Sequence, residues 1–329
     1  MKPFNFVNAE SVAHACSLLG TDSSGAVMIA GGTDLMGEIK EGIVTPETVV
    51  NLPDGLGLVG IEATSDGMTI GAMTTVADIA AHQIINADFP ALAQAASSVA
   101  TPQIRNVGTL GGNLCQRPRC WYYRSPMFDC RKKGGAICFA ENGSNKYHAI
   151  LGATDCYIVH PSDLAVALMS LQAEVTITGG DASRTIPLDD LFVGPEVNIL
   201  AETCLAQGEI VTEVFVPSIK AGQRSVYLKA RERQAQDFAL VSVASCLRIT
   251  GGVIQEARIV LGGVAPVPYR LFACEESLIG ARVEQLDTKA IGQLAVRDAQ
   301  PLRDNHYKVR LASSLVSRAV ETLIALDPQ

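Results

Sequence analysis

The chain has 329 residues, of which 48% are hydrophobic and 18% charged, and this length predicts two or three globular domains. The net charge is −8, with 34 acidic against 26 basic residues, which argues against a general nucleic-acid or anionic-membrane binder. The sequence contains no apolar run of about 18 residues and no secretory-type N-terminal segment, so we expect no transmembrane helix and a cytoplasmic location, with export by means of a partner's signal as the alternative.

Helical and strand-like periodicities alternate through the N-terminal part of the chain, and this alternation predicts α/β architecture. Thr74 is the candidate N-cap of one of the helices. The predicted elements are a helix at 9–19, strands at 26–30 and 48–52, a hairpin of 58–63 and 68–73, and helices at 75–82 and 89–98.

Two glycine-rich turns are the first candidates for a binding site. The strand at 26–30 runs directly into Gly31-Gly32-Thr33-Asp34-Leu35, and Gly108-Thr109-Leu110-Gly111-Gly112-Asn113 follows later. Glycine tolerates positive φ and lets backbone N–H groups approach an anion. The first turn alone is equally compatible with a plain strand–turn connection, and neither turn is a Rossmann or P-loop motif. Together, the two turns suit a flavin or nicotinamide dinucleotide.

We predict a domain boundary at 217–224. After it the pattern changes to antiparallel strands followed by helices, which indicates an α+β domain. Before the boundary, a short strand at 156–160 precedes Pro161. The predicted elements are strands at 156–160, 173–178, 183–186, 208–217, 225–229, 240–249 and 257–264, a helical turn at 189–192, and helices from about 271, from about 290 and at 306–326.

The chain has nine cysteines, and five of them lie between residues 115 and 156. No C-x2-C pair occurs, so the spacing matches neither a zinc ribbon nor the common ferredoxin runs. Residues 117–133 contain six Arg and Lys residues and a single acid, Asp129. Cations near thiols favour thiolates and suit an anionic cluster. Scattered reduced thiols, a [4Fe–4S] cluster and zinc all remain open, and we expect Cys16, Cys204, Cys246 and Cys274 to be core residues.

The acid–base residues form no recognisable catalytic triad. Asp163 precedes a predicted helix, and its side chain is either a helix N-cap or an acceptor for a ligand hydroxyl such as a ribityl group. Lys229 ends a predicted strand, where a solvated lysine is the ordinary alternative to a ligand contact.

Four segments in order and spacing give the chain a family resemblance: Ala30 to Leu35, Ile104 to Asn113, Pro161 to Leu164 and Lys229 to Arg231. The chain resembles the FAD-binding medium subunits of the molybdenum hydroxylases, the xanthine dehydrogenase and carbon monoxide dehydrogenase family. The resemblance implies a vanillyl-alcohol-oxidase-type (PCMH-type) FAD-binding domain of two subdomains at residues 1–217. It also implies an α+β, CO dehydrogenase flavoprotein-like C-terminal domain at 222–327.

The resemblance also implies which residues contact FAD. The first turn would hold the pyrophosphate, the second turn would bind further along, and Asp163 would contact the polar chain. Val211 would approach the isoalloxazine through its backbone, with Lys229 near the carbonyl side of the ring. The residues implied are Met28, Ile29, Ala30, Gly31, Gly32, Thr33, Asp34, Leu35, Thr109, Leu110, Gly111, Gly112, Asn113, Asp163, Val211 and Lys229. No catalytic residue is implied.

The cysteine-rich insertion, at about 115–156, is similar to that of a subset of the family, which includes 4-hydroxybenzoyl-CoA reductase and a bacterial aldehyde oxidoreductase. The similarity implies a [4Fe–4S] cluster held by Cys120, Cys130, Cys138 and Cys156, with Cys115 as the alternative to Cys156.

The function implied by the resemblance is that of an FAD-containing electron-transfer subunit. Its partners would be a molybdopterin-containing large subunit and a small subunit with two [2Fe–2S] clusters, in a heterotrimer or a dimer of heterotrimers. The alternative is a stand-alone flavin oxidoreductase with its own substrate pocket and zinc in the cysteine loop. The sequence identifies neither the organic substrate nor the electron acceptor.

Overall fold

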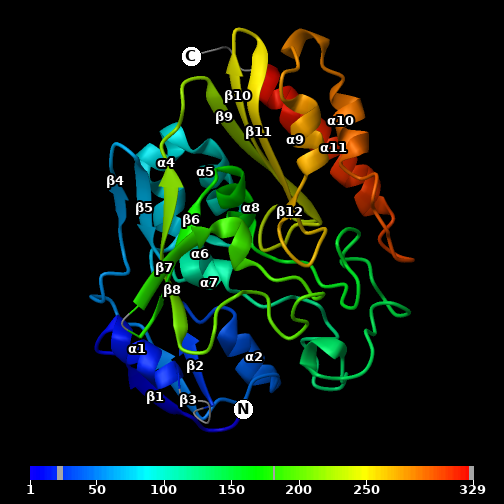
Figure 1. The fold of residues 1–329 in the computed structure, drawn as a ribbon. Coiled ribbons are helices and arrows are strands. Elements are labelled where there is room, and N and C mark those ends of the chain that lie inside the picture. The colour runs from blue at the N-terminus through cyan, green and yellow to red at the C-terminus, as the bar shows by residue number, and fades with distance from the viewer. Residues whose placement is uncertain (21–24, 181, 326–329) are drawn as a thin grey trace.

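Three sheets follow one another along the chain in the computed structural model, which describes residues 1–20, 25–180 and 182–325 (Figure 1). The first sheet is parallel, with order β1-β3-β2. Parallel neighbours need crossover connections, and α1 and α2 supply them. Ser11 starts α1, because its Oγ accepts a hydrogen bond from the His14 N–H at 3.0 Å. The elements of this layer are β1 (Asn5–Asn8), α1 (Val12–Leu19), β2 (Ala26–Ile29), α2 (Leu35–Glu41) and β3 (Thr48–Asn51).

The second sheet is antiparallel, with order β4-β5-β8-β6-β7, and most of its helices come from the long connection between β5 and β6. Helix α8 is buried along its whole length between this layer and the next. The elements of this layer are β4 (Ile61–Ala63), β5 (Gly67–Gly71), α3 (Val76–Ala81), α4 (Gln83–Asp88), α5 (Pro90–Ser98), α6 (Pro102–Arg105), α7 (Leu110–Leu114), η1 (Arg131–Lys133), α8 (Asp163–Ser170), β6 (Glu174–Gly179), β7 (Ala182–Pro187), η2 (Leu188–Leu191) and β8 (Glu209–Pro217).

The third sheet is antiparallel with order β12-β11-β10-β9 and is covered on both faces. Side chains alternate between faces along a strand. Val243 packs in the hydrophobic cluster of α9 and α11, whereas Ala244 packs in the cluster of α5 and α8. Tyr227 faces α5 and α8 too, and so does Lys229, two residues further along. The elements are β9 (Gln223–Ala230), β10 (Val241–Thr250), β11 (Val253–Gly262), β12 (Tyr269–Arg270), α9 (Phe272–Leu278), η3 (Val283–Gln285), α10 (Thr288–Leu294) and α11 (Tyr307–Ala325).

The predicted fold class, α/β and α+β, is confirmed, but four local predictions are wrong. Residues 156–160 form no strand, and 106–113 contain most of α7 rather than only a turn. Helix α3 is capped by Thr75, whose side chain accepts from the Asp78 N–H, and not by Thr74. Cys204 lies half-buried in a loop. Asp181, in the turn of the predicted hairpin 173–186, and residues 326 and 327 lie outside the described residues.

Candidate functional site

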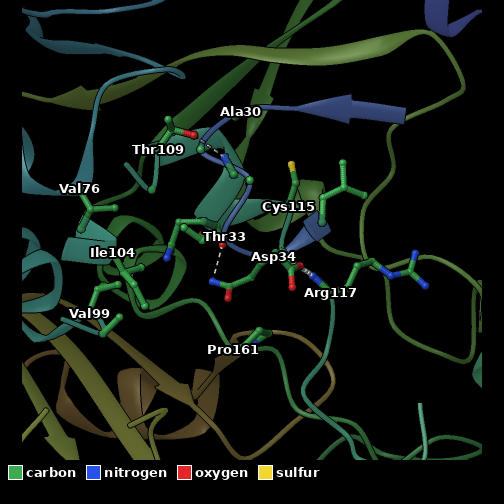
Figure 2. Close-up of a pocket in the computed structure, with 18 of the residues that line it drawn as sticks. Ala30, Thr33, Asp34, Val76, Val99, Ile104, Thr109, Cys115, Arg117 and Pro161 are labelled. Atoms are coloured by element: carbon green, nitrogen blue, oxygen red, sulfur yellow. Dashed lines mark hydrogen bonds between the residues drawn. The ribbon is translucent and has the colours of Figure 1, made fainter. Parts of the chain in front are cut away.

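A cavity of about 560 Å³ lies where the first two sheets and the end of β9 meet. Sixteen residues were expected to bind a cofactor, and all of them except Ile29 and Leu110, hence fourteen, line this one cavity. Figure 2 shows Ala30, Thr33 and Asp34 of the first turn facing the same space as Thr109 of the second. The volume lies within the range of about 300–1,000 Å³ that is typical of ligand pockets.

The two glycine turns pack directly on each other, and this contact explains why glycine occupies position 31. A Cβ on Gly31 would lie 1.8 Å from the carbonyl oxygen of Val107. This distance is too short for any residue other than glycine. Gly32 has φ +68°, a conformation that favours glycine. Thr109 caps α7 through its Oγ1, which accepts from the Gly112 N–H at 3.2 Å. The sequence therefore builds a backbone-lined cradle from two distant segments.

Asp163 also lines the cavity, as part of a buried set of polar groups. Its carboxylate accepts hydrogen bonds from the Tyr227 hydroxyl and from Lys229 Nζ, the latter at 2.6 Å. Burial raises the pKa of Tyr227 well above its usual value, so the phenol stays protonated and donates. The N-cap interpretation of Asp163 is wrong, because Ser162 caps α8 by accepting from the Ala165 N–H. Lys229 is also not a solvated lysine, because its side chain is 4% exposed.

Asp34 has neighbours that the sequence did not indicate. The Arg117 N–H donates to its carboxylate at 2.7 Å, Arg124 Nη2 donates at 2.7 Å, and Arg119 Nη1 also donates. These three arginines belong to the cysteine-rich insertion and line the large cavity together with Cys115. The insertion therefore forms part of the wall of this cavity.

The four cysteines expected to bind a cluster line one small second cavity. Cys115 does not, since it lines the large cavity. His148 Nε2 lies 3.2 Å from Cys120 Sγ. Burial raises the pKa of Cys120 to about 11, whereas a hydrogen bond from Cys156 lowers the pKa of Cys138 to about 6. Within 1–20, 25–180 and 182–325, no three His, Cys, Asp or Glu residues are grouped to hold one metal ion.

The cations of the insertion do not surround the cysteines as expected. Only Arg131 and Lys132 line the cysteine cavity, and both are paired with carboxylates. Lys133 donates instead to the carbonyls of Tyr122 and Ser125. The expectation that these cations activate the thiols is therefore not supported at Cys120, where burial dominates.

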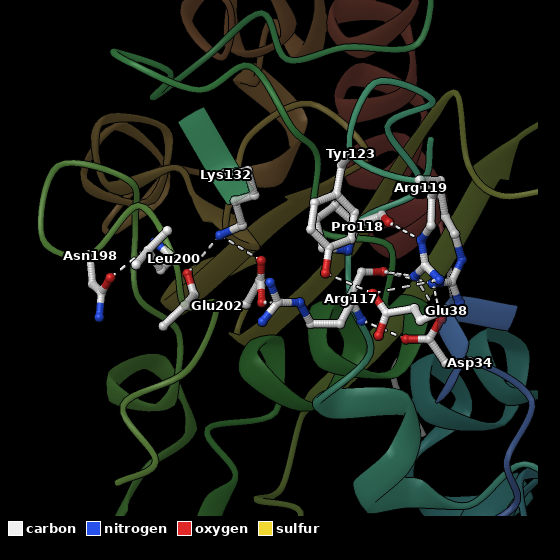
Figure 3. A network of polar contacts seen from close by, with 12 residues as sticks. Asp34, Glu38, Arg117, Pro118, Arg119, Tyr123, Lys132, Asn198, Leu200 and Glu202 are labelled. Carbon is white, nitrogen blue, oxygen red and sulfur yellow. Dashed lines mark hydrogen bonds and ion pairs between the residues drawn. The ribbon is translucent and has the colours of Figure 1, made fainter. Parts of the chain in front are cut away.

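A buried charge network joins the two cavities (Figure 3). Glu202 Oε1 lies 2.5 Å from Lys132 Nζ, in the wall of the cysteine cavity, and its Oε2 lies 3.0 Å from Arg117 Nε, in the wall of the large cavity. On the other side of Arg117, Glu38 accepts from the Tyr123 hydroxyl at 2.7 Å. Glu202 therefore forms ion pairs with one residue in the wall of each cavity.

Comparisons with known proteins agree on one family over the whole chain. Residues 2–219 match the family described as "FAD binding domain in molybdopterin dehydrogenase", and residues 226–323 match the "CO dehydrogenase flavoprotein C-terminal domain". The chain is 36% identical over 316 residues to the aldehyde oxidoreductase FAD-binding subunit PaoB of Escherichia coli K12, covering 95% of each chain. It is 27% identical over 322 residues to the carbon monoxide dehydrogenase medium chain of Hydrogenophaga pseudoflava, covering 96% of each.

Solved structures give the same result. A CO dehydrogenase chain from Oligotropha carboxidovorans superposes with a TM-score of 0.78 at 25% identity, covering 98% of both chains. A carbon monoxide dehydrogenase chain from Hydrogenophaga pseudoflava superposes with a TM-score of 0.76 at 28% identity. No helix in the described part of the chain is both long and apolar enough to cross a membrane.

Proposed function

The chain belongs to the FAD-binding medium subunits of the molybdenum hydroxylases, an oxidoreductase family, and on this premise we propose that it carries electrons between its partner subunits and an external acceptor. The observation that carries the proposal is the gathering of fourteen expected FAD contacts around one cavity. The partners would be a molybdopterin-containing large subunit and a small subunit with two [2Fe–2S] clusters. A heterotrimer or a dimer of heterotrimers, acting in the cytoplasm, fits this role.

The residues of the cavity fit FAD. The paired backbones at Gly31 and Val107 form a cradle without side chains, which suits a pyrophosphate. Asp163 can accept hydrogen bonds from ribityl hydroxyls in addition to those from Tyr227 and Lys229, because each carboxylate oxygen has two lone pairs. When bound, FAD supplies the exchange between one-electron and two-electron chemistry, and the protein supplies binding and electrostatics.

We assign roles to the lining residues on the same basis. The first turn, from Met28 to Leu35, holds the pyrophosphate, and the second, from Thr109 to Asn113, binds further along the cofactor. The buried backbone at Val211 and the Lys229 ammonium group contact the flavin ring. The FAD-binding domain would comprise residues 1–217 and the C-terminal domain 222–327.

Mixing experiments test the electron-transfer role. The large and small partners are first reduced with dithionite and then mixed with the FAD-loaded chain, while the flavin absorbance is followed. We expect the flavin absorbance to bleach when the partners are present and to persist when the small partner is omitted. Turnover of an organic substrate by this chain without partners would instead support the stand-alone flavin oxidoreductase.

We also propose that Cys120, Cys130, Cys138 and Cys156 hold a [4Fe–4S] cluster. In such a cluster each thiolate binds a different iron, so the four sulfurs surround a volume rather than one ion. The four cysteines line one cavity, which supports a cluster that they share. The position of Cys115 in the other cavity supports Cys156 as the fourth ligand.

Metal analysis of anaerobically purified protein tests the cluster. We expect about four iron and four sulfide per chain in the wild type and a loss of most of the iron in Cys156→Ser. Cys115→Ser is the matched control, because it changes a half-buried cysteine outside the cysteine cavity. Zinc without iron in the wild type, or loss of iron in Cys115→Ser alone, would contradict the assignment.

A further inference from the structure

The end of the cysteine-rich insertion is held by a segment from the other end of the chain. Residues 304–308, which lead into α11, contact residues 145–149, and we call these two stretches the anchor and the return segment. The Asp304 N–H, for example, donates to the Asn145 side-chain oxygen at 2.8 Å. The anchor belongs to the part of the chain that matches the C-terminal family, and the return segment belongs to the part that matches the FAD-binding family. The two family segments therefore meet at this contact.

Lys308 lies at the centre of this contact and is fully buried, with 0% of the residue exposed. Its Nζ donates to the carbonyls of Tyr147 at 2.8 Å, His148 at 3.0 Å and Gly263 at 2.8 Å. Burial lowers its pKa to about 7, and within the described residues no carboxylate opposes that shift. The side chain is therefore surrounded by backbone carbonyls rather than by an acid.

A buried lysine at this position is costly for two reasons. Burial disfavours a charged group that has no ion-pair partner. Lys308 is also the second residue of α11, and the positive end of the helix dipole disfavours a cation in the first turn. Three carbonyls at one nitrogen need three N–H donors, and only the ammonium form of a lysine supplies three. The carbonyls of two segments therefore converge on one positive charge, and that charge fixes where the return segment lies.

Asn305 strengthens the same contact and is also fully buried. Its Nδ2 donates to the carbonyls of His148 and Ala149, both at 3.1 Å. Its Oδ1 accepts from the Leu302 N–H at 2.7 Å, and this hydrogen bond orients the amide. Together, Lys308 and Asn305 bind three consecutive carbonyls of the return segment, from residue 147 to residue 149.

The return segment reaches two of the four cysteines of the cysteine cavity. His148 lines that cavity, and its Nε2 lies 3.2 Å from Cys120 Sγ. The Ala149 N–H donates to the carbonyl of Tyr157 at 3.0 Å. Tyr157 follows Cys156 directly in the sequence and lines the same cavity. A displacement of the return segment would therefore disturb the surroundings of Cys120 and of Cys156 together.

From these contacts we propose that Lys308 is a positioning residue of the cysteine site, which it serves from the other end of the chain. Together with Asn305 it fixes the path of the return segment, and the return segment fixes the geometry at Cys120 and Cys156. Lys308 lines neither the cysteine cavity nor the large cavity, so it acts only through the residues that it holds. The inference rests on the proposed [4Fe–4S] cluster, because the bound iron reports that geometry.

The Lys308→Met substitution tests this role in anaerobically purified, iron-loaded protein at about pH 6, where the ammonium form predominates in the wild type. Hydrogen–deuterium exchange follows the amides of residues 149–151, which donate to the carbonyls of Tyr157 and Val264. We expect these amides to exchange at least about 10-fold faster in the variant, because the return segment opens locally. We also expect the variant to lose about half or more of its iron, and the dithionite-reduced cluster that remains to show altered g values in EPR spectra.

Two further variants separate positioning from general stability. Leu323→Ala is the matched control, because it also removes a buried side chain of α11, but one that packs in the core of the third sheet, about 22 Å further along the helix. It should keep the wild-type g values and speed exchange at 149–151 no more than its loss of stability in urea accounts for. Asn305→Ala removes two hydrogen bonds to the return segment without removing a charge, so it should change exchange and g values in the same direction as Lys308→Met. It carries the test if Lys308→Met yields no folded chain.

Two results would overturn the proposal. One is wild-type exchange and wild-type g values in the folded variants of Lys308 and Asn305. The other is a change of g values in Leu323→Ala as large as that in Lys308→Met. The iron content of the wild type separates the two levels of inference. Wild-type protein that holds no iron contradicts the proposed cluster and this inference with it, whereas iron-loaded wild type with unchanged variants contradicts only the role of Lys308.

Discussion

The Glu202→Gln substitution tests whether the charge network holds the cysteine-rich insertion against the rest of the chain. Glu202 and Lys132 have side chains that are 4% and 2% exposed, and the substitution leaves the Lys132 ammonium with the Ala201 carbonyl and a neutral amide. Removing one partner of a buried ion pair costs about 3–5 kcal/mol. Arg117 also loses its ion pair with Glu202, but its side chain is 32% exposed, so water can solvate the guanidinium group. We therefore expect a loss of unfolding free energy at the low end of this range, about 3 kcal/mol.

Urea unfolding of the purified chain measures this cost. The matched control is Glu256→Gln, which neutralises a partly exposed acid paired with Lys220 at 2.9 Å and with Arg248 at 3.0 Å, and which should cost about 0–1 kcal/mol. In a Lys132→Met background no buried ammonium is stranded, so the cost of Glu202→Gln should fall by at least about half. The reasoning is refuted if Glu202→Gln destabilises the chain no more than Glu256→Gln does.

Three further predictions concern the cofactor cradle and its surroundings. Gly31→Ala should lose most of its bound FAD, because its Cβ would meet the Val107 carbonyl at 1.8 Å. Gly42→Ala should lose some stability, since Gly42 has φ +74°, but should retain FAD because its Cβ would meet nothing within 4 Å; equal flavin absorbance in both would count against the cradle. Lys229→Met should also lose flavin, with the exposed Lys220→Met as control. Burial lowers the pKa of His160 from 6.5 to about 3. As the pH falls below 6.5, the unfolded chain therefore binds a proton that the folded chain does not, and the free energy of unfolding decreases until the pH reaches about 3. Between about pH 7 and pH 5 the wild type should lose about 2 kcal/mol more than His160→Gln in urea unfolding, and identical losses would contradict the neutral buried imidazole.

Local patterns predicted those parts of the fold that depend on neighbours in sequence. The apolar run before Gly31 and the alternation in 208–217 identified β2 and β8, whose flanking turns set their ends. The run at 156–160 has the same apolar character but forms no strand. Its backbone bonds instead to loops, as when the His160 N–H donates to the Ala265 carbonyl at 3.0 Å. Whether an apolar run forms a strand depends on which other segment of the chain packs beside it, and the composition of the run does not reveal that segment.

The candidate site shows the same division. The glycine turns indicate a cradle from local sequence alone. The burial of Lys229 and the partners of Asp163 depend instead on β9 packing against α5, which brings its side chains to the start of α8. The insertion gives the clearest example. Residues 117–133 contain one acid, which made their cations look free to serve the cysteines. Their carboxylate partners, Asp34 and Glu202, lie 85 and 70 residues away from Arg119 and Lys132.

The ion pairs of Asp34 suggest why an acid can occupy a cradle for an anion. A carboxylate beside a pyrophosphate would be repelled unless it were neutralised. Arg119 and Arg124 both form ion pairs with this single carboxylate, so Asp34 presents no unpaired negative charge to a ligand. Both arginines come from the cysteine-rich insertion, so the insertion contributes to the FAD cavity as well as forming the cysteine cavity. The two candidate sites are therefore electrostatically one unit, and a substitution that releases the insertion should weaken FAD binding even when every residue of the two glycine turns is intact.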